Sequence, residues 1–137
     1  MRVVLDTNVF ISAIFWRGSP HDILKFAEED KITLVSSREI LEELFGVLQR
    51  DKFQPYLQQT QTNLPELIEH ISSIVEVFSP LKKVSIIEED PSDNKFLDCA
   101  LSSGASFIIS GDHHLLDLKE FQDILIVAPS QFLKRFR

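Results

Sequence analysis

The chain has 137 residues, of which 44% are hydrophobic and 26% are charged, and its formal net charge is −7 at pH 7. This length and residue usage predict a single globular domain, residues 1–137, with a substantial core. The negative charge argues against a protein that holds nucleic acid by a general basic coat.

The one cysteine, Cys99, excludes an intramolecular disulfide and is typical of a reducing compartment. The apolar run after Met1 stops at Asp6, which makes it too short for a signal segment. No other stretch is long enough to span a membrane. We therefore expect a cytoplasmic protein with no membrane partner.

Strand and helix patterns alternate from the start of the chain. Val3–Leu5 is a short β-branched run that predicts a strand, and Ser19-Pro20 is an N-cap with proline at the first helical position. The helix it opens continues to about Glu29, and Ile32–Val35 predicts a second strand. These elements form a β-α-β unit.

Capping signals and apolar runs predict the rest of the chain. The expected elements are, in order, a helix capped by the box Ser36–Glu39 and running to about Arg50, a polar turn at Gln58–Thr62, a helix capped at Asn63–Glu66 with Leu64, Leu67, Ile68, Ile71 and Val75 on one face, a helix from Asp90-Pro91 to Gly104, strands at Ser106–Ser110 and Ile124–Val127, and a helix after Pro129.

Short buried strands that alternate with helices predict a parallel sheet covered on both faces. We expect a three-layer α/β/α sandwich with a central, mostly parallel sheet of four to five strands. Ligands of such sheets bind beyond the carboxyl ends of the strands.

Four acidic residues are candidates for that edge: Asp6 ends the first strand, Asp112 follows the strand Ser106–Ser110, and Glu43 and Asp93 lie in predicted helices. A cluster of carboxylates with no matching lysine or arginine nearby in sequence is costly unless a hard divalent cation neutralises it. The four residues together therefore favour a Mg²⁺ or Mn²⁺ site, although each alone is also explained as a helix cap or turn residue.

Helical phase separates these acids from their neighbours. Glu43 borders the buried stripe of its helix, whereas Glu42 faces solvent and Glu39 belongs to the capping box. Asp93 falls within the apolar stripe of its own helix. In that helix Asp98 and Cys99 fall on the side predicted to be exposed, and we interpret the cysteine as structural.

Five segments resemble the motifs of a known family, in the same order and over nearly the whole chain. They are Asp6-Thr7-Asn8-Val9, Leu34–Ser36 through Glu43-Leu44 to Val47-Leu48, Asp90–Asp93 through Phe96-Leu97 to Ala100, Ser110–Asp112 with Leu115-Leu116, and Pro129–Leu133. The ordered set resembles the PIN domain family, in particular its toxin-like branch.

The resemblance implies an endoribonuclease that depends on Mg²⁺ or Mn²⁺, cleaves single-stranded RNA and acts as the toxin of a toxin–antitoxin pair. It implies Asp6, Glu43, Asp93 and Asp112 as catalytic and metal-binding residues, an antitoxin protein as partner, and a homodimer. Three polar residues, Thr7, Asn8 and Ser110, are expected to support the site. The hydroxyl of Thr7 would orient Asp6. A divalent ion would activate water and neutralise charge during phosphodiester hydrolysis.

The chain departs from the family where a further acid often follows Asp112, because it has His113-His114 there. A second metal is then weakly held or absent. His114 could serve as a softer ligand that favours Mn²⁺, but an exposed histidine at a helix start is the simpler interpretation. The alternative function is a binding module, catalytically weak or inactive, that docks a protein partner.

Overall fold

The computed structural model describes residues 1–79 and 93–136, and its strands form one sheet in the order β3-β2-β1-β4-β6-β5. The strands are β1 (Arg2–Leu5), β2 (Thr33–Ser36), β3 (Val75–Val77), β4 (Phe107–Ile109), β5 (Glu120–Phe121) and β6 (Ile124–Val127). All neighbouring pairs are parallel except β5 with β6. The α/β class is confirmed, with six strands rather than four to five, because Val75, expected on the apolar face of a helix, begins β3 and because β5 has only two residues.

The described part of the chain also has eight α-helices and one 3₁₀ helix: α1 (Thr7–Phe15), α2 (Ser19–Glu28), α3 (Arg38–Leu48), η1 (Asp51–Phe53), α4 (Gln54–Gln59), α5 (Leu64–Ile74), α6 (Asn94–Ser103), α7 (His113–Leu116) and α8 (Pro129–Phe136). The expected elements omitted α1, whose nearly uniform apolar sequence has no polar face to reveal a helical period.

The helix boundaries follow local capping chemistry. Ser37 caps α3 by accepting a hydrogen bond from the Ile40 amide, one residue later than predicted. Asn63 caps α5 as predicted, but Val75 leaves the helix and begins β3, where it pairs with Leu34. The predicted turn at 58–62 is helical as far as Gln59.

Helix α6 ends as predicted, at Gly104, whose φ of 70° is left-handed. Its predicted start at residues 90 and 91 lies outside the described residues.

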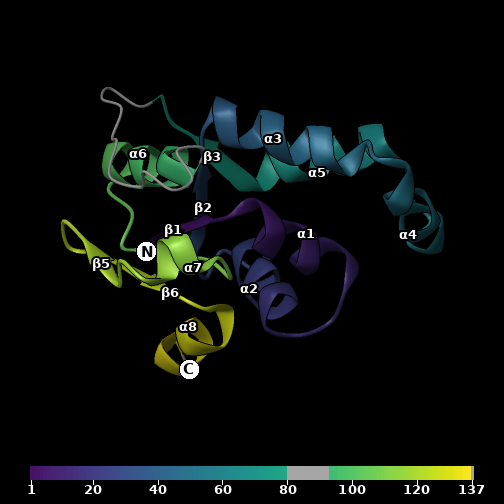
Figure 1. The fold of residues 1–137 in the computed structure, drawn as a ribbon. Coiled ribbons are helices and arrows are strands. Elements are labelled where there is room, and N and C mark those ends of the chain that lie inside the picture. Colours follow the sequence, from purple (N-terminus) through teal and green to yellow (C-terminus); the bar gives the residue numbers. More distant parts are fainter. Residues whose placement is uncertain (80–92, 137) are drawn as a thin grey trace.

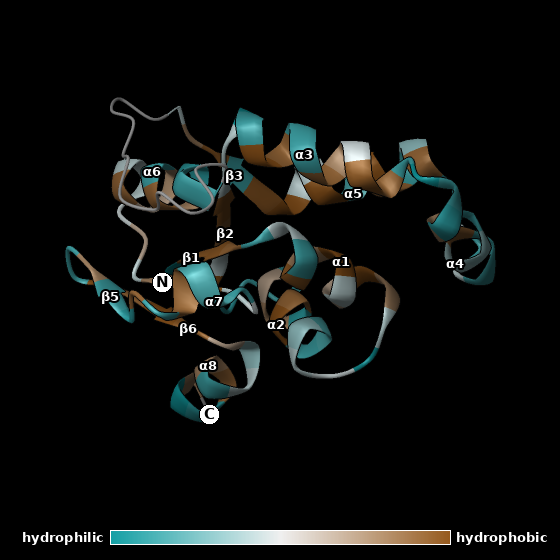
Figure 2. Cartoon of the chain, in the orientation of Figure 1, coloured by the Kyte–Doolittle hydropathy of each residue, from teal (hydrophilic) through white to brown (hydrophobic). Residues whose placement is uncertain are grey.

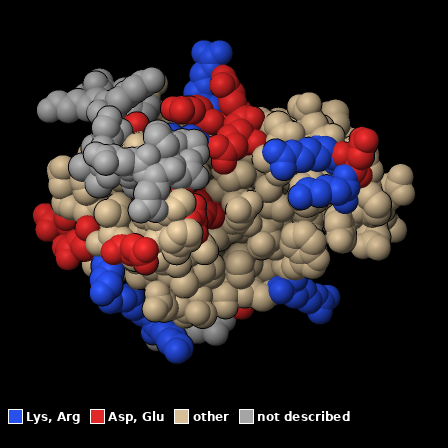
Figure 3. Space-filling view, viewed as in Figure 1, with Lys and Arg blue, Asp and Glu red and all other residues tan. Residues whose placement is uncertain are grey.

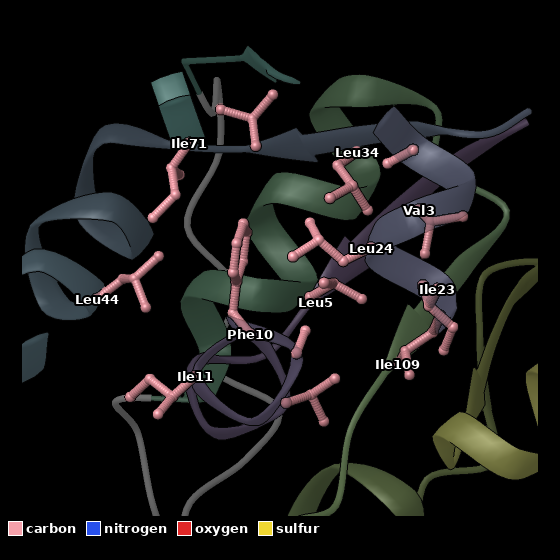
Figure 4. Close-up of a cluster of buried hydrophobic side chains, with 14 of the residues drawn as sticks. Val3, Leu5, Phe10, Ile11, Ile23, Leu24, Leu34, Leu44, Ile71 and Ile109 are labelled. Atoms are coloured by element: carbon pink, nitrogen blue, oxygen red, sulfur yellow. The ribbon is translucent and has the colours of Figure 1, made fainter. Parts of the chain in front are cut away.

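The sheet separates two cores, and Figure 1 shows α1, α2 and α8 on one side of it and α6 on the other. Side chains alternate along the strands: Val3 and Leu5 point into the core beneath α1 and α2, whereas Val4 points into the core beneath α6. Figure 2 shows the strands as mainly hydrophobic, and Figure 4 shows Phe10, Ile23 and Leu24 packed around Val3 and Leu5 in the first core.

Helix α6 is buried almost all round, since eight of its ten residues are buried. The prediction that Asp98 and Cys99 are exposed was wrong: Asp98 is 6% exposed and Cys99 is fully buried in the second core. A helix with a single buried face would expose both residues, but α6 packs against the sheet and also contacts α3. In the described residues, no helix is both long and apolar enough to cross a membrane.

Strand register brings the polar residues that follow β1 and β4 together. Leu5, the last residue of β1, pairs with Ile109, the last residue of β4. The Asp6 amide continues the ladder by donating to the Ile109 carbonyl at 3.0 Å. Asp6 and Ser110 therefore leave the carboxyl edge of the sheet side by side.

Candidate functional site

Asp6 is held in one orientation by three donors. Its Oδ1 accepts from the Val9 amide at 2.8 Å, which caps α1, and its Oδ2 accepts from the Ser110 hydroxyl and, at 3.3 Å, from the Gly111 amide. Ser110 is fully buried and also accepts from the Asp112 amide at 2.9 Å. The helix cap and the sheet edge therefore fix the Asp6 carboxylate together, so capping and a role in a site are compatible.

We expected the hydroxyl of Thr7 to orient Asp6, but it contacts a different acid. It donates to Oε1 of Glu43, which projects from α3. The other oxygen of Glu43, Oε2, lies 2.5 Å from the ammonium nitrogen of Lys95, on α6. Thr7 and Lys95 thus position Glu43 between two helices.

Glu42 behaves as helical phase predicted and differs sharply from Glu43. It is exposed and forms an ion pair with Arg38 at 2.8 Å, one turn earlier in α3. The side chain of Glu43 is 38% exposed and lines a cleft of about 750 Å³. Glu39 is exposed, and Ser37 has the capping role.

Asp93, Asp112 and His114 bring ligand atoms to within 4.8 Å of one another. His114 Nδ1 lies 3.7 Å from Asp112 Oδ1 and 4.0 Å from Asp93 Oδ2. Asp93 occupies the N-cap position of α6 without a capping bond, whereas Asp112 caps α7 by accepting from the His114 amide at 3.0 Å. The interpretation of His114 as an exposed histidine was wrong, because its side chain is 22% exposed and faces both acids.

The pKa values of two of these acids move in opposite directions. Burial raises the pKa of Asp6, against the lowering effect of its three hydrogen bonds, and the Asp112 charge raises it further. The pKa of Asp112 is lowered, chiefly by a hydrogen bond with the Asp93 carboxyl group and then by the His114 amide and the two histidine rings, although burial opposes them. Asp6, Asp93 and Asp112 are therefore electrostatically linked.

One cleft of about 750 Å³ contains all four predicted acids. Its acidic part is lined by Asp6, Glu43, Asp93, Asp112, Thr7 and the exposed Asn8, and its remaining wall includes Trp16, Arg50, Lys52, Phe53 and Tyr56. Figure 3 shows acidic side chains in the middle of this face and basic ones to the right, over the region where Figure 1 labels α3 and α4.

The donor set fits a hard or borderline divalent cation. Two carboxylates and one imidazole nitrogen converge, with the oriented carboxylate of Asp6 close enough to Asp112 to raise its own pKa. Oxygen ligands suit Mg²⁺, and a single imidazole nitrogen shifts the preference toward Mn²⁺. The catalytic and metal-binding roles of the four acids remain a prediction.

Sequence reasoning missed Lys95. Lys95 is 5% exposed, yet about 100° per residue places it on the side of α6 opposite to Leu97, where phase predicts solvent. Its proximity to Asp93 in the sequence was the available signal, since a lysine two residues from a candidate ligand supplies the counter-charge that the four acids were expected to lack.

A family model described as "PIN domain" matches residues 2–114. An uncharacterized protein of Methanocaldococcus jannaschii is 31% identical over 145 aligned positions, which cover 99% of this chain and 92% of that protein.

Solved structures of similar fold include two VapBC structures. The VapBC2 complex of Rickettsia felis, bound to a DNA fragment from its promoter, matches with a TM-score of 0.60 at 17% identity and covers 92% of this chain and 97% of that chain. VapBC-1 of nontypeable Haemophilus influenzae matches with a TM-score of 0.57 at 19% identity and covers 95% of this chain and 99% of that one. Since the matched family model spans most of the sequence, the chain belongs to the PIN domain family.

Proposed function

We propose that this chain is an endoribonuclease that cleaves single-stranded RNA with Mg²⁺ or Mn²⁺. The observation that carries the proposal is the convergence of Asp93, Asp112 and His114, with ligand atoms within 4.8 Å of one another, in a cleft shared with Asp6 and Glu43. Membership of the PIN domain family supports a nuclease of this type.

A divalent ion bound by Asp93, Asp112 and His114 would lower the pKa of water and neutralise charge on the reacting phosphate. The chain's own residues prepare the surroundings of that chemistry. Asp6 is held rigidly by Ser110 and two backbone amides, so little reorganisation is needed when a cation or phosphate arrives.

Glu43 and Lys95 form the second half of the proposed site. The ammonium group of Lys95 reduces the repulsion between this acidic cleft and an RNA phosphate, and its contact with Glu43 restrains the glutamate beside the three aspartates. Glu43 is exposed enough to accept a proton from a water molecule or to bind a hydrated cation. Asn8, exposed on the same wall, offers an amide to a phosphate oxygen.

We further propose that the protein is the toxin of a toxin–antitoxin pair. Two solved structures of similar fold are VapBC structures, which supports an antitoxin as the protein partner of this chain. A homodimer is proposed on the same family grounds.

The second candidate function, an inactive binding module, is favoured by one observation: His113-His114 occupies the place where family members often carry a further acid.

Cleavage of a labelled single-stranded RNA by protein freed of any antitoxin tests the enzyme proposal. We expect cleavage in Mn²⁺ or Mg²⁺ and none in EDTA. Glu43→Gln should abolish cleavage, and the matched variant Glu42→Gln should cleave like wild type, since Glu42 pairs with Arg38 in solvent. Full activity in EDTA, or loss of activity in Glu42→Gln alone, would overturn the proposed site; no cleavage in any metal would favour the binding module.

A further inference from the structure

One part of the cleft wall has a different chemistry from the acidic part. It combines the aromatic side chains of Trp16, Phe53 and Tyr56 with the cations Arg50 and Lys52. Aromatic rings and cations on one surface are the two elements with which proteins bind single-stranded nucleic acid. None of these residues belongs to the motifs that indicated the acidic cluster.

Trp16 is exposed and contacts the rings of Phe15 and Tyr56. It follows α1, is 44% exposed, and packs edge-on against Tyr56, with ring centroids 5.1 Å apart and an interplanar angle of 67°. Behind it, Phe15 stacks on Phe53 at 5.4 Å and 11°. Exposing a large apolar ring is unfavourable in the free protein, and the rings beneath it restrict its movement.

Two cations line the same cleft as these aromatic rings. Arg50 and Lys52 are exposed where the chain passes from α3 into η1, and the Lys52 ammonium nitrogen is 5.1 Å from the centre of the Phe53 ring. In a chain of net charge −7, these cations share one cleft with the acidic cluster. A polyanion that entered the cleft would therefore be attracted to this wall and not to the acids.

We propose that four residues of this wall, Trp16, Tyr56, Arg50 and Lys52, form a subsite for the nucleotides that flank the cleaved bond in single-stranded RNA. One base stacks on the exposed face of Trp16, and Arg50 and Lys52 meet neighbouring phosphates. The inference rests on the proposed ribonuclease function and adds the means of substrate selection. Bases of a duplex are already stacked on one another, so only an unpaired base reaches the ring.

The chain contains one tryptophan, so its fluorescence reports directly on Trp16. A 12-nucleotide oligouridylate, titrated in EDTA to prevent cleavage, should quench the emission of the wild-type protein. An abasic oligomer of the same length and a 12-base-pair RNA duplex should leave it nearly unchanged. Equal quenching by the abasic oligomer would overturn stacking, and no quenching by oligouridylate would overturn the subsite.

Fluorescence anisotropy of a labelled oligouridylate extends the test to variants. Trp16→Leu should weaken binding by at least about fivefold, whereas Trp16→Phe, which keeps a stacking ring, should bind nearly as wild type. Val77→Ala, at an exposed apolar residue outside the cleft, is the matched control. Thermal melts identify any unfolded variant, and the quenching of wild-type emission keeps the inference testable if Trp16→Leu fails to fold.

The cations are tested by the salt dependence of the same binding. Arg50→Ala/Lys52→Ala should reduce the slope of log K against log salt by about 1.4, because each phosphate contact on a single strand contributes about 0.7. Lys134→Ala/Arg135→Ala, two cations of α8 outside the cleft, should leave it unchanged. Equal slopes in both double variants would overturn the phosphate contacts.

These measurements separate the subsite from the proposed reaction. Binding that depends on Trp16 without cleavage in any metal would contradict the enzyme and retain the subsite. Metal-dependent cleavage with unchanged RNA binding in Trp16→Leu and in Arg50→Ala/Lys52→Ala would contradict the subsite alone. If these variants instead lost only a protein partner, the wall would be a protein-docking surface and the inference would be wrong.

Discussion

The ammonium nitrogen of Lys95 lies 2.5 Å from a carboxylate oxygen of Glu43, across the contact between α3 and α6. Lys95 is almost fully buried, whereas the side chain of Glu43 is 38% exposed at the cleft. Lys95, which is not one of the four predicted acids, thus restrains Glu43 beside the three aspartates.

Lys95→Met and Glu43→Gln should be energetically coupled. If Lys95 acts through Glu43, the two substitutions together should change the free energy of unfolding by less than the sum of their separate effects, with a coupling of about 0.5–3 kcal/mol. Urea unfolding of wild type, both single variants and the double variant in EDTA measures this. Strict additivity would show that the contact does not restrain Glu43.

Metal-free stability should depend on pH in opposite ways at Asp6 and Asp112. The pKa of Asp6 is raised by burial, so the folded chain binds this proton more tightly than the unfolded chain, and the stability contribution of Asp6 falls as pH rises above its ordinary value of 3.8. The pKa of Asp112 is lowered, chiefly by the Asp93 carboxyl group, so its contribution is present above 3.8 and is lost as pH falls through the lowered value.

Melting temperatures between about pH 3 and pH 7 in EDTA test these signs. The melting temperature of Asp6→Asn minus that of wild type should increase with pH. The melting temperature of Asp112→Asn minus that of wild type should decrease with pH. Any constant offset from altered hydrogen bonds does not affect the slopes. Parallel pH profiles for the two variants would contradict the assigned electrostatics.

His114 should tune the preference for the metal. With an imidazole nitrogen beside two carboxylates, Mn²⁺ should raise the melting temperature of wild type more than Mg²⁺ at equal concentration. His114→Ala should lose that difference and retain some response to Mg²⁺. His113→Ala is the control, because the His113 side chain is 73% exposed. Unchanged Mn²⁺ selectivity in His114→Ala would exclude the imidazole as a ligand.

Cys99 should be chemically inert in the folded protein. Burial, with a smaller contribution from the Asp98 charge, raises its thiol pKa to about 12, so the reactive thiolate is scarce at pH 8. Ellman's reagent should react with one thiol per chain in guanidinium chloride and only very slowly without it. Rapid stoichiometric reaction of the native protein would show that the core around α6 opens readily.

The sequence predicted the parallel sheet because its central strands are short, apolar and bounded by polar residues. The same logic located Asp6 and Asp112, since both follow strands that end at one edge. It did not find β3, because Val75 also fits the apolar face of α5 and only pairing with Leu34 decides between helix and strand. Where a local pattern is compatible with both a helix and a strand, pairing with a neighbouring strand decides the structure.

Helical phase worked where a helix has one buried face and failed where it has none. In α3 it separated Glu43 from Glu42 correctly, because α3 has a solvent side. In α6 it placed Asp98 and Cys99 in solvent and gave no signal for Lys95, although all three are buried. A sequence pattern cannot report contacts that the rest of the fold makes with the polar side of a helix.

The most direct test of the proposed metal-dependent site is the single-turnover cleavage rate of single-stranded RNA in Mn²⁺ for Asp93→Asn, Asp112→Asn and Asp117→Asn. Asp93 and Asp112 contribute to the cluster, whereas Asp117 is an exposed acid at the end of α7. The first two variants should be slowed by at least about 100-fold and Asp117→Asn should match wild type. Wild-type rates in Asp93→Asn and Asp112→Asn would contradict the assignment of these carboxylates to the reaction.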